Sequence, residues 1–520
     1  MFDILICGAL IVDGSGSEGY IGDVGVEGGK ISAVGRLGGA AAVEVIEAEG
    51  RCLTPGFIDI HRHADAALFS HDWGRAELAQ GLTTIINGNC GLSLAPVCGA
   101  HAVEIQRYLS PIVGELPEGR EFPSMASYLA QAREAAPPVN TFMLAGMGTI
   151  RACAAGFSDL PLTAEQYARV HRLLEESLAG GAIGVSLGLG YAPECFYDTE
   201  GLIRALEPLR GSSTVVTVHM RQEGDGVVDA LREMLAVARE LRMPLEISHL
   251  KAIGRRNWRK SVPEMLRLIG EARQDGLDIM CDVYPFPAGS TQLIHVLPPE
   301  YQAGGTEALT AALLDPLTRE RMRERMETGS DFENISLLVG FENIRATSLH
   351  RPENLEFEGR SIAEIAASKG SSDFDALFDL LASEHCAVSM IDFIADEEDI
   401  CDILRAPFSG VISDATYPAS GLLHPRVYGT YPRLFERYVL GKSVLSLPEA
   451  VRKVTRQPAD RFGLRTKGRI EPGADADLCL FDPSALRERD SYEHPETLAT
   501  GMDYVLVGGR PAIAEARFTF

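Results

Sequence analysis

The stretch Gly56-Phe57-Ile58-Asp59-Ile60-His61-Arg62-His63-Ala64-Asp65 decides the fold that we expect for this chain. It follows Pro55 and begins with a short apolar run typical of a buried parallel strand. Alternate residues of a strand project to the same side, so His61 and His63 can present two imidazoles to one metal ion. The alternative, two surface histidines, is disfavoured by the buried strand before them. Both stand at its C-terminal end, where active sites form in α/β barrels.

Seven further apolar runs repeat the strand pattern along the chain. They are Thr83–Ile86, Thr141–Ala145, Ala182–Ser186, Thr214–Val218, Leu245–Ile247, Asp278–Met280 and Gly410–Ile412. Helical patterns lie between several of them, most clearly at Ala164–Ala179 and Val227–Leu241. Eight strands alternating with helices predict an α/β fold, a (β/α)8 TIM-like barrel over residues 56–465. Charged, helix-like sequence at Arg319–Glu327 predicts an inserted subdomain at about 289–342.

Both ends of the chain read as short strands separated by glycine-rich turns. At the N-terminal end these are Ile4–Cys7, Leu10–Val12, Gly22–Val26 and Lys30–Val34, and at the C-terminal end Ala476–Phe481 and Tyr504–Val507. Each end alone is too small to bury a good core. We therefore expect residues 1–55 and 466–520 to form one small β-sandwich together.

The composition excludes several classes of protein. The chain has 520 residues, of which 46% are hydrophobic and 23% are charged, as in an ordinary globular protein. Its formal net charge of −25 makes it a poor candidate for binding nucleic acid or an anionic membrane. No run is apolar for the ~20 residues that a membrane span needs, and no signal-peptide pattern is found. Ten cysteines without a CxxC pair predict reduced thiols and a cytoplasmic location.

Three more potential metal ligands stand at the ends of predicted strands. Cys90 follows Ile85-Ile86-Asn87-Gly88-Asn89, His219 follows Val215–Val218, and His249 follows Leu245–Ser248. A single buried Cys or His is usually structural, but three such strand ends beside His61 and His63 are hard to explain by packing. A thiolate combined with imidazoles favours Zn²⁺ over Mg²⁺ or Ca²⁺.

A carboxylate completes the candidate site. Asp414 ends the eighth predicted strand in Val411-Ile412-Ser413-Asp414. Hydrolysis at a metal needs a group that takes a proton from water and gives one to the leaving group. Asp414 can fill that role, although an Asp in this position can also simply cap the following helix.

On these residues the chain resembles the amidohydrolase superfamily, and within it the D-aminoacylases (N-acyl-D-amino-acid deacylases). The resemblance covers nearly the whole chain. Its motifs are Gly56–Asp59 with His61 and His63, Gly88-Asn89-Cys90-Gly91, Gly181–Gly184 with Tyr191, His219-Met220-Arg221, Ser248–Lys251, Asp282–Pro285, Ser413-Asp414, His424-Pro425-Arg426, Tyr428–Thr430 and Pro472–Leu478. The Asn-Cys-Gly motif is the most specific, because most relatives place a carboxylated Lys on the fourth strand. Here that strand reads Gly184-Val185-Ser186-Leu187, without a Lys.

The resemblance also implies roles for individual residues. Cys90, His219 and His249 would hold a tightly bound zinc, and His61, His63 and Asp414 would surround a second, weaker site. Asp414 would be the proton shuttle. The positions that hold the substrate in the family are matched by Tyr191, Lys251, Tyr284 and Ser290, to which Arg426 could add charge. Lys and hydroxyl groups suit a carboxylate.

Two departures from the family pattern stand out. Arg62 lies between the two histidines, where relatives usually carry a small residue, and we expect its side chain to point away from the metal. After Asp414 the chain reads Ala415-Thr416-Tyr417-Pro418 in place of glycine-rich sequence. The second departure bears on substrate choice and not on the reaction class.

The expected function is zinc-dependent hydrolysis of the linear amide bond of a small N-acyl-D-amino acid. A cyclic amidase, such as a hydantoinase or dihydroorotase, is the first alternative, and Cys90 without a fourth-strand Lys disfavours it. A non-catalytic scaffold is the second, but it would have lost ligands that are all present here.

The side-chain preference is predicted from the residues that follow Ser290. Relatives that prefer acidic substrates carry an Arg there, whereas this chain reads Thr291-Gln292-Leu293-Ile294-His295-Val296-Leu297-Pro298. A second substrate carboxylate would lose its hydration without gaining a fixed partner. Apolar surface from Leu293–Leu297 would instead favour neutral or apolar side chains, unless these residues pack inside the inserted subdomain.

Overall fold

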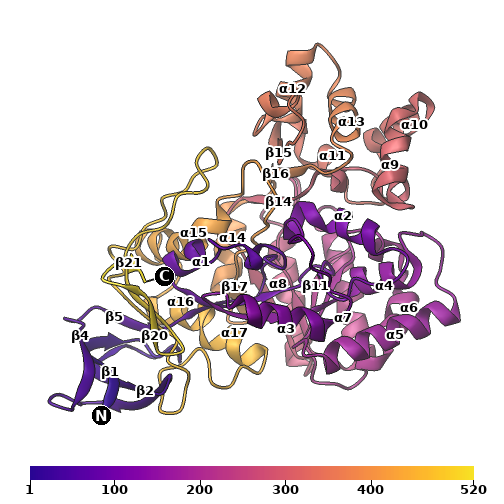
Figure 1. The fold of residues 1–520 in the computed structure, drawn as a ribbon. Helices are drawn as coiled ribbons and strands as arrows, with labels where there is room; N and C mark the ends of the chain where they lie inside the picture. The colour runs from indigo at the N-terminus through magenta and orange to yellow at the C-terminus, as the bar shows by residue number, and fades with distance from the viewer. Residues whose placement is uncertain (520) are drawn as a thin grey trace.

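A barrel of parallel strands forms the body of the computed structural model, which describes residues 1–519 (Figure 1). Its strands are β6 (Phe57–Asp59), β7 (Leu82–Asn87), β8 (Asn140–Met143) continuing into β9 (Ala145–Gly146), β10 (Val185–Gly188), β11 (Val216–His219), β12 (Leu245–Ile247), β13 (Ile279–Val283) and β17 (Ser409–Val411). They pair in the orders β6-β7-β8 and β9-β10-β11-β12-β13-β17. Only Leu144 separates β8 from β9. The predicted (β/α)8 fold is therefore confirmed.

The barrel closes between β17 and β6, where the two ends of the strand order meet. The Asp414 amide donates to the His61 carbonyl at 2.9 Å, and Arg62 forms a parallel bridge with Ala415. This closure places the residues after β6 and β17 side by side, although more than 300 positions separate them in the sequence. The residues that follow the first and the last barrel strand thus meet at one rim of the barrel.

Helices follow the strands around the barrel. They are α1 (Arg75–Ala79), α2 (Ala102–Val113), α3 (Met125–Ala135), α4 (Met147–Ala155), α5 (Ala164–Ala179), α6 (Thr199–Ala205), α7 (Val227–Leu241), α8 (Ser261–Gln274), α14 (Glu397–Arg405), α15 (Arg426–Arg433), α16 (Leu447–Val454) and α17 (Arg456–Arg461). The helices α5 and α7 have the predicted bounds. Thr163 and Gln166 form a capping box at the start of α5, which satisfies two backbone N–H groups there.

An insertion, residues 288–393, separates β13 from β17 and stands at the top of Figure 1. Its antiparallel sheet has the order β14-β16-β15, with β14 at Ala288–Gln292, β15 at Ile344–Thr347 and β16 at Ser389–Phe393. Its helices are α9 (Gly305–Leu314), α10 (Pro316–Thr328), α11 (Ile335–Val339), α12 (Ile362–Lys369) and α13 (Asp373–Ser383). The predicted insertion at about 289–342 covers only its first half, because the central strand β16 pairs with a strand about 100 residues earlier.

Strands from both ends of the chain share one sheet, at the lower left of Figure 1. Its order is β21-β20-β19-β18-β5-β1-β2-β3, with β4 paired to β1. The strands are β1 (Phe2–Ile11), β2 (Tyr20–Glu27), β3 (Lys30–Gly35), β4 (Ala42–Glu47), β5 (Cys52–Pro55), β18 (Leu478–Phe481), β19 (Met502–Val507), β20 (Arg510–Ala514) and β21 (Arg517–Phe518). The predicted strands Ile4–Cys7 and Leu10–Val12 belong largely to one strand, β1. Its pairing with β2 shifts register between Ile6 and Ala9, next to Gly8, whose φ is 64°. The glycine bends the strand without ending it.

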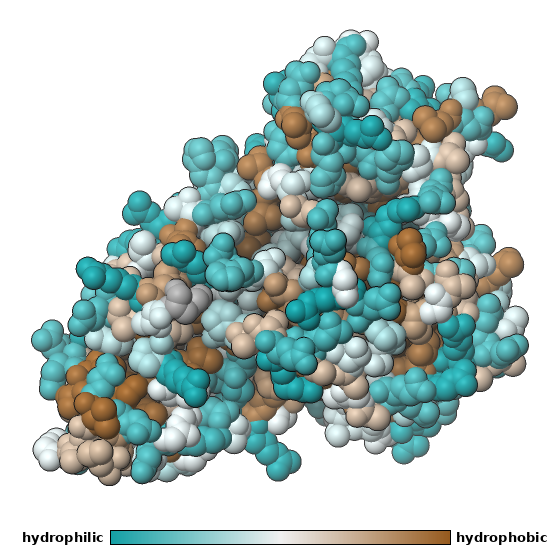
Figure 2. All heavy atoms as spheres, viewed as in Figure 1, coloured by the Kyte–Doolittle hydropathy of each residue, from teal (hydrophilic) through white to brown (hydrophobic). Residues whose placement is uncertain are grey.

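The face drawn in Figure 2 is mostly hydrophilic with scattered apolar residues, and a more compact apolar area lies at the lower left, over the nine-stranded sheet formed by both ends of the chain. In that sheet β2 and β4 expose Ile21, Val43 and Val45. Within residues 1–519, no helix has the length and apolarity needed to cross a membrane.

Candidate metal centre

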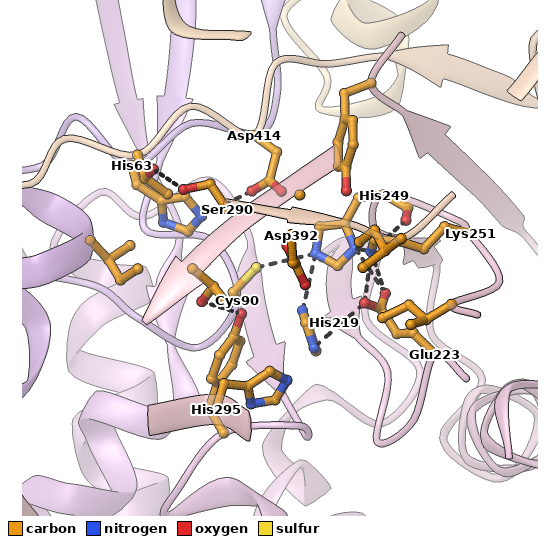
Figure 3. A pocket seen from close by; sticks show the side chains of 18 of the residues that line it. His63, Cys90, His219, Glu223, His249, Lys251, Ser290, His295, Asp392 and Asp414 are labelled. Atoms are coloured by element: carbon orange, nitrogen blue, oxygen red, sulfur yellow. Dashed lines mark hydrogen bonds and ion pairs between the residues drawn. The ribbon is translucent and has the colours of Figure 1, made fainter. Parts of the chain in front are cut away.

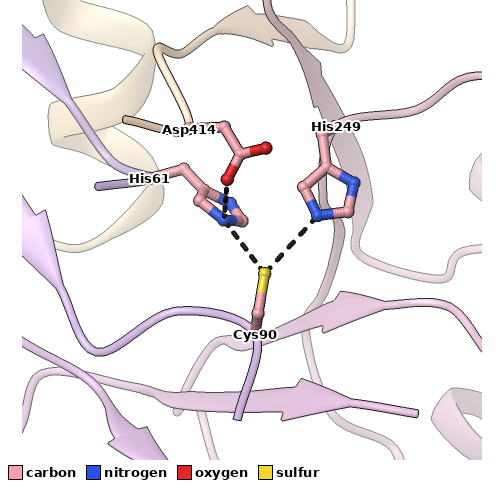
Figure 4. Close-up of side chains that lie close together, drawn as sticks. All are labelled: His61, Cys90, His249 and Asp414. Atoms are coloured by element: carbon pink, nitrogen blue, oxygen red, sulfur yellow. Dashed lines mark hydrogen bonds and ion pairs between the residues drawn. The ribbon is translucent and has the colours of Figure 1, made fainter. Parts of the chain in front are cut away.

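Six candidate ligands meet at the C-terminal end of the barrel, and all are buried (Figures 3 and 4). They are His61 and His63 after β6, Cys90 after β7, His219 at the end of β11, His249 after β12 and Asp414 after β17. The strand ends bring these residues together as the sequence predicts, because all eight strands run in one direction.

The Cys90 thiol contacts two of the histidines in this group. Its Sγ is 3.2 Å from His61 Nε2 and 3.5 Å from His249 Nε2, and His249 Nε2 is in turn 3.2 Å from His219 Nδ1. His61, Cys90, His249 and Asp414 form one cluster that could hold a metal ion, and His219, Glu223 and His249 form another. His249 belongs to both. The geometry thus places His61 as near to Cys90 as His249.

The Asp414 carboxylate lies close to both His61 and His63. Its Oδ1 is 3.3 Å from His61 Nε2 and 3.3 Å from His63 Nε2, while Oδ2 pairs with Arg426 Nη1 at 2.8 Å. Burial acts to raise the pKa of Asp414, but Arg426 and His61 hold the pKa well below its usual range. The carboxylate is therefore ionised at neutral pH.

Three of the ligands have a left-handed backbone. The φ angle is 53° at Cys90, 37° at His249 and 53° at Asp414. Residues other than Gly rarely adopt this conformation, and it costs roughly 1–2 kcal/mol each. Such strain is typical of functional sites, because the fold must hold a side chain in one particular direction.

The donor set fits a soft or borderline cation. Burial lowers the pKa of His61 to about 3, so the imidazole is neutral and keeps a lone pair for a metal. The buried Nδ1 atoms of His61 and His63 have no hydrogen-bond partner within residues 1–519. One thiol and several imidazoles within about 3.5 Å of one another match the chemistry of zinc better than that of a hard cation.

Glu223 is a functional candidate that the sequence did not reveal. Its carboxylate accepts hydrogen bonds from Lys251 Nζ at 2.7 Å on both oxygens and lies 3.0 Å from His249 Nδ1. Burial opposes ionisation, but Lys251 and the two neighbouring histidines hold the pKa of Glu223 below its usual range. Its position four residues after His219 could have suggested this role, but the loop between them hides the geometry.

One pocket includes the five predicted substrate-binding residues together with most of the candidate ligands (Figure 3). The five are Tyr191, Lys251, Tyr284, Ser290 and Arg426. Tyr191 OH lies 2.9 Å from Thr291 Oγ1, and the Arg426 guanidinium stacks 4.8 Å from the centre of the Tyr284 ring and donates to the Ser290 carbonyl. The pocket thus combines donors and cations near the candidate metal ligands.

The apolar run after Ser290 does not line this pocket. Leu293, Ile294, Val296 and Leu297 are buried in a 3-10 helix (η4, Leu293–Val296) and the residue after it, packed in the main core. Only Thr291 and His295 of this stretch line the pocket. Its apolar surface comes from other elements, through Leu92, Ile112, Ile253, Ile335 and Ile394.

Arg62 points away from the ligands, as expected. It is fully buried, and its guanidinium pairs with Glu77 at 2.7 Å and with Asp59 at 3.1 Å. It also donates to Tyr417 OH at 2.7 Å and to Ser413 Oγ at 3.1 Å. Arg62 therefore ties the end of β6 to the end of β17 behind the site.

Comparisons with known proteins agree with this architecture. A model of the amidohydrolase family matches residues 412–513. A D-aminoacylase of Alcaligenes xylosoxydans xylosoxydans is 34% identical over 100% of this chain and 96% of its own, and an N-acyl-D-aspartate deacylase of the same organism is 32% identical over 98% and 91%. The chain is an amidohydrolase by fold and site. Within that class it belongs to the D-aminoacylase family.

Solved structures give the same result. An N-acyl-D-glutamate deacylase of Bordetella bronchiseptica, complexed with zinc and a phosphonate mimic of the tetrahedral intermediate, has a TM-score of 0.84 at 30% identity and covers 99% of this chain and 98% of its own. A D-aminoacylase structure has a TM-score of 0.82 at 32% identity, with 100% and 98% covered. An L-hydantoinase of Arthrobacter aurescens, at 15% identity and a TM-score of 0.55, shares the fold alone.

Proposed function

We propose that this protein hydrolyses the amide bond of N-acyl-D-amino acids in a zinc-dependent reaction. The products are a carboxylate and a free D-amino acid, and water supplies the added atoms. The observation that carries the proposal is the contact of the Cys90 thiol with the imidazoles of His61 and His249, of which His249 in turn contacts His219, beside a pocket that also holds Lys251. The relatives named as D-aminoacylase and deacylases support it.

The proposed metal ligands follow the expectation from the family. Cys90, His219 and His249 would hold one zinc tightly, and His61, His63 and Asp414 would surround a second, weaker site. A bound zinc would supply Lewis acidity, polarising the acyl carbonyl and lowering the pKa of water. The shared position of His249, and the contact of Cys90 with His61, support two neighbouring sites.

Asp414 is the proposed proton shuttle. It is buried and ionised, and it lies between the two histidines that follow β6 and the Arg426 guanidinium. It would take a proton from the attacking water and deliver it to the departing nitrogen of the amide. Arg426 would hold the Asp414 side chain in place and favour its ionised form before it takes the proton and after it delivers it.

The substrate carboxylate is proposed to bind to the hydroxyl and cationic groups of the pocket. These are Tyr191, Lys251, Tyr284, Ser290 and Arg426. No Arg or Lys follows Ser290 up to Pro298, so a second carboxylate on the substrate would find no fixed partner there. We therefore expect neutral side chains to be preferred over D-Glu and D-Asp. The cytoplasmic location stays a prediction.

A panel of N-acetyl-D- and L-amino acids, hydantoin and dihydroorotate tests the activity. Release of acetate from D-enantiomers is the expected result. Hydrolysis of the cyclic amides alone would support the cyclic amidase instead, and hydrolysis of L-enantiomers alone would contradict the family activity.

Metal analysis tests the ligands. Cys90→Ala is expected to lose tightly bound zinc and activity after dialysis. The conservative control is Cys98→Ala, because Cys98 lies outside the pocket. Full retention of zinc and activity by Cys90→Ala would overturn the assignment.

A further inference from the structure

Asp392 is a pocket residue that the proposed reaction leaves without a role. It stands on β16, opposite Gly289 of β14 and Ile344 of β15. Its side chain lines the pocket that contains the candidate ligands, and the residue is only 3% exposed (Figure 3). Within residues 1–519 its carboxylate makes no ion pair and no hydrogen bond to another residue. Burying a carboxylate without a hydrogen-bond partner is costly, and a cationic group on a ligand would offset that cost.

The cations of the pocket are already paired with other carboxylates. Lys251 Nζ lies 2.7 Å from Glu223, and Arg426 Nη1 lies 2.8 Å from Asp414. The lining therefore carries three carboxylates against two fixed side-chain cations. The α-carboxylate of an N-acyl amino acid would add a further negative charge. Of these three carboxylates, Asp392 is the one that forms an ion pair with neither Lys251 nor Arg426.

The backbone opposite Asp392 keeps space beside its carboxylate. A Cβ atom at Gly289 would lie 2.9 Å from Asp392 Oδ1 and 3.3 Å from the Tyr284 hydroxyl. A side chain at this position would thus crowd the space between the two groups. Burial raises the pKa of Asp392 to about 6, against the opposing effect of Lys251 and Arg426, so the carboxylate is mostly ionised above neutral pH.

We infer that Asp392 determines specificity and selects N-acyl-D-amino acids with a cationic side chain, such as D-lysine. This inference rests on the proposed function and narrows its substrate class. An ammonium group gives the carboxylate a charge-assisted partner, which a neutral side chain cannot do. An acidic side chain would place a second negative charge beside the Asp392 carboxylate, which no side chain within residues 1–519 pairs with directly. The expected order of kcat/KM is therefore cationic, then neutral, then acidic.

The test compares N-acetyl-D-lysine with N-acetyl-D-norleucine, which has the same carbon chain without the ammonium group. N-acetyl-D-glutamate completes the series. Released acetate is measured instead of released amine, because the side-chain amine of lysine would react in an amine assay even before hydrolysis. The variants are Asp392→Asn, which removes the charge, Asp392→Glu, which retains it, and Asp229→Asn as a control for an exposed carboxylate on α7.

The wild-type enzyme is expected to favour D-lysine over D-norleucine about tenfold in kcat/KM, as a charged hydrogen bond allows. Asp392→Asn is expected to bring this ratio to about threefold or less, and the Asp229→Asn control to leave it unchanged. A wild-type ratio below about threefold overturns the inference whether or not the variants fold. It leaves the proposed function standing if any N-acetyl-D-amino acid is hydrolysed. No hydrolysis across the panel would remove both.

Discussion

Replacing Arg62 with Met tests whether the network behind the site holds the barrel together. The guanidinium is fully buried between Glu77 and Asp59, at 2.7 and 3.1 Å. Met fills much of the same volume but leaves two buried carboxylates without their cation. Both keep hydrogen-bond partners, because Glu77 still accepts from Tyr417 OH at 2.6 Å and Asp59 still accepts from the Ser413 hydroxyl and from the Ser413 and His61 amides.

The magnitude follows from the cost of breaking a buried ion pair, about 3–5 kcal/mol. The remaining hydroxyl partners keep the estimate within this range instead of doubling it. Unfolding entropy of ~2.1 cal/mol/K per residue gives roughly 1.1 kcal/mol/K for this chain, so the melting temperature should fall by about 3–5 °C. For Arg62→Met we therefore expect the free energy of unfolding to fall by about 3–5 kcal/mol.

Two further variants make the assay specific. Arg232→Met removes exposed ion pairs with Asp229 and Glu264, which should cost less than about 1 kcal/mol. Adding Glu77→Gln to Arg62→Met removes one of the stranded charges and should recover part of the loss. Thermal and urea unfolding of the four proteins provide the measurement. The reasoning fails if Arg62→Met is no less stable than the exposed control, or if Glu77→Gln adds a further full loss.

Three other changes have expected outcomes. Asp414→Asn should lower kcat by ~10²–10⁴-fold with zinc still bound, and a loss below about tenfold would mean that another residue moves the proton. Glu223→Gln removes the charge shared by His249 and Lys251, so zinc affinity measured by competition with a chelator should fall about 10–100-fold, and unchanged affinity would contradict the positioning role. Burial raises the pKa of Glu194 from 4.5 to about 8, so its contribution to stability is complete below pH 4.5 and is lost as the pH rises through about 8. Glu194→Gln should flatten this dependence in urea titrations, and an unchanged slope would refute it.

The barrel could be predicted because its signals are local. Each buried strand is a short apolar run, and each ligand follows such a run within a few residues, as Cys90 and His249 do. One-directional strands then bring all the ends together without any knowledge of pairing. The roles of individual ligands could not be derived in this way. They depend on distances, such as the 3.2 Å between Cys90 and His61, that no spacing encodes.

The insertion shows where local signals end. Strand β16 pairs with β14 about 100 residues earlier, so neither the length of the insertion nor the position of Asp392 could be read from the sequence. The run Leu293–Leu297 shows the converse error, because an apolar stretch beside a site residue can face the core as easily as the pocket. An apolar residue is expected to be buried, but its apolarity does not show whether it packs in the core or lines a pocket.

The left-handed backbone conformation of Cys90, His249 and Asp414 directs these side chains into the site. A strand sends alternate side chains to opposite faces, so a residue just beyond its end has no guaranteed direction. At Cys90, His249 and Asp414 a positive φ turns the chain and fixes the side chain within the site. The His249 amide donates to Asp282 and the Asp414 amide donates to the His61 carbonyl, so tertiary hydrogen bonds hold these unfavourable angles. At His249 and Asp414 the barrel therefore stabilises a backbone conformation that local propensity opposes.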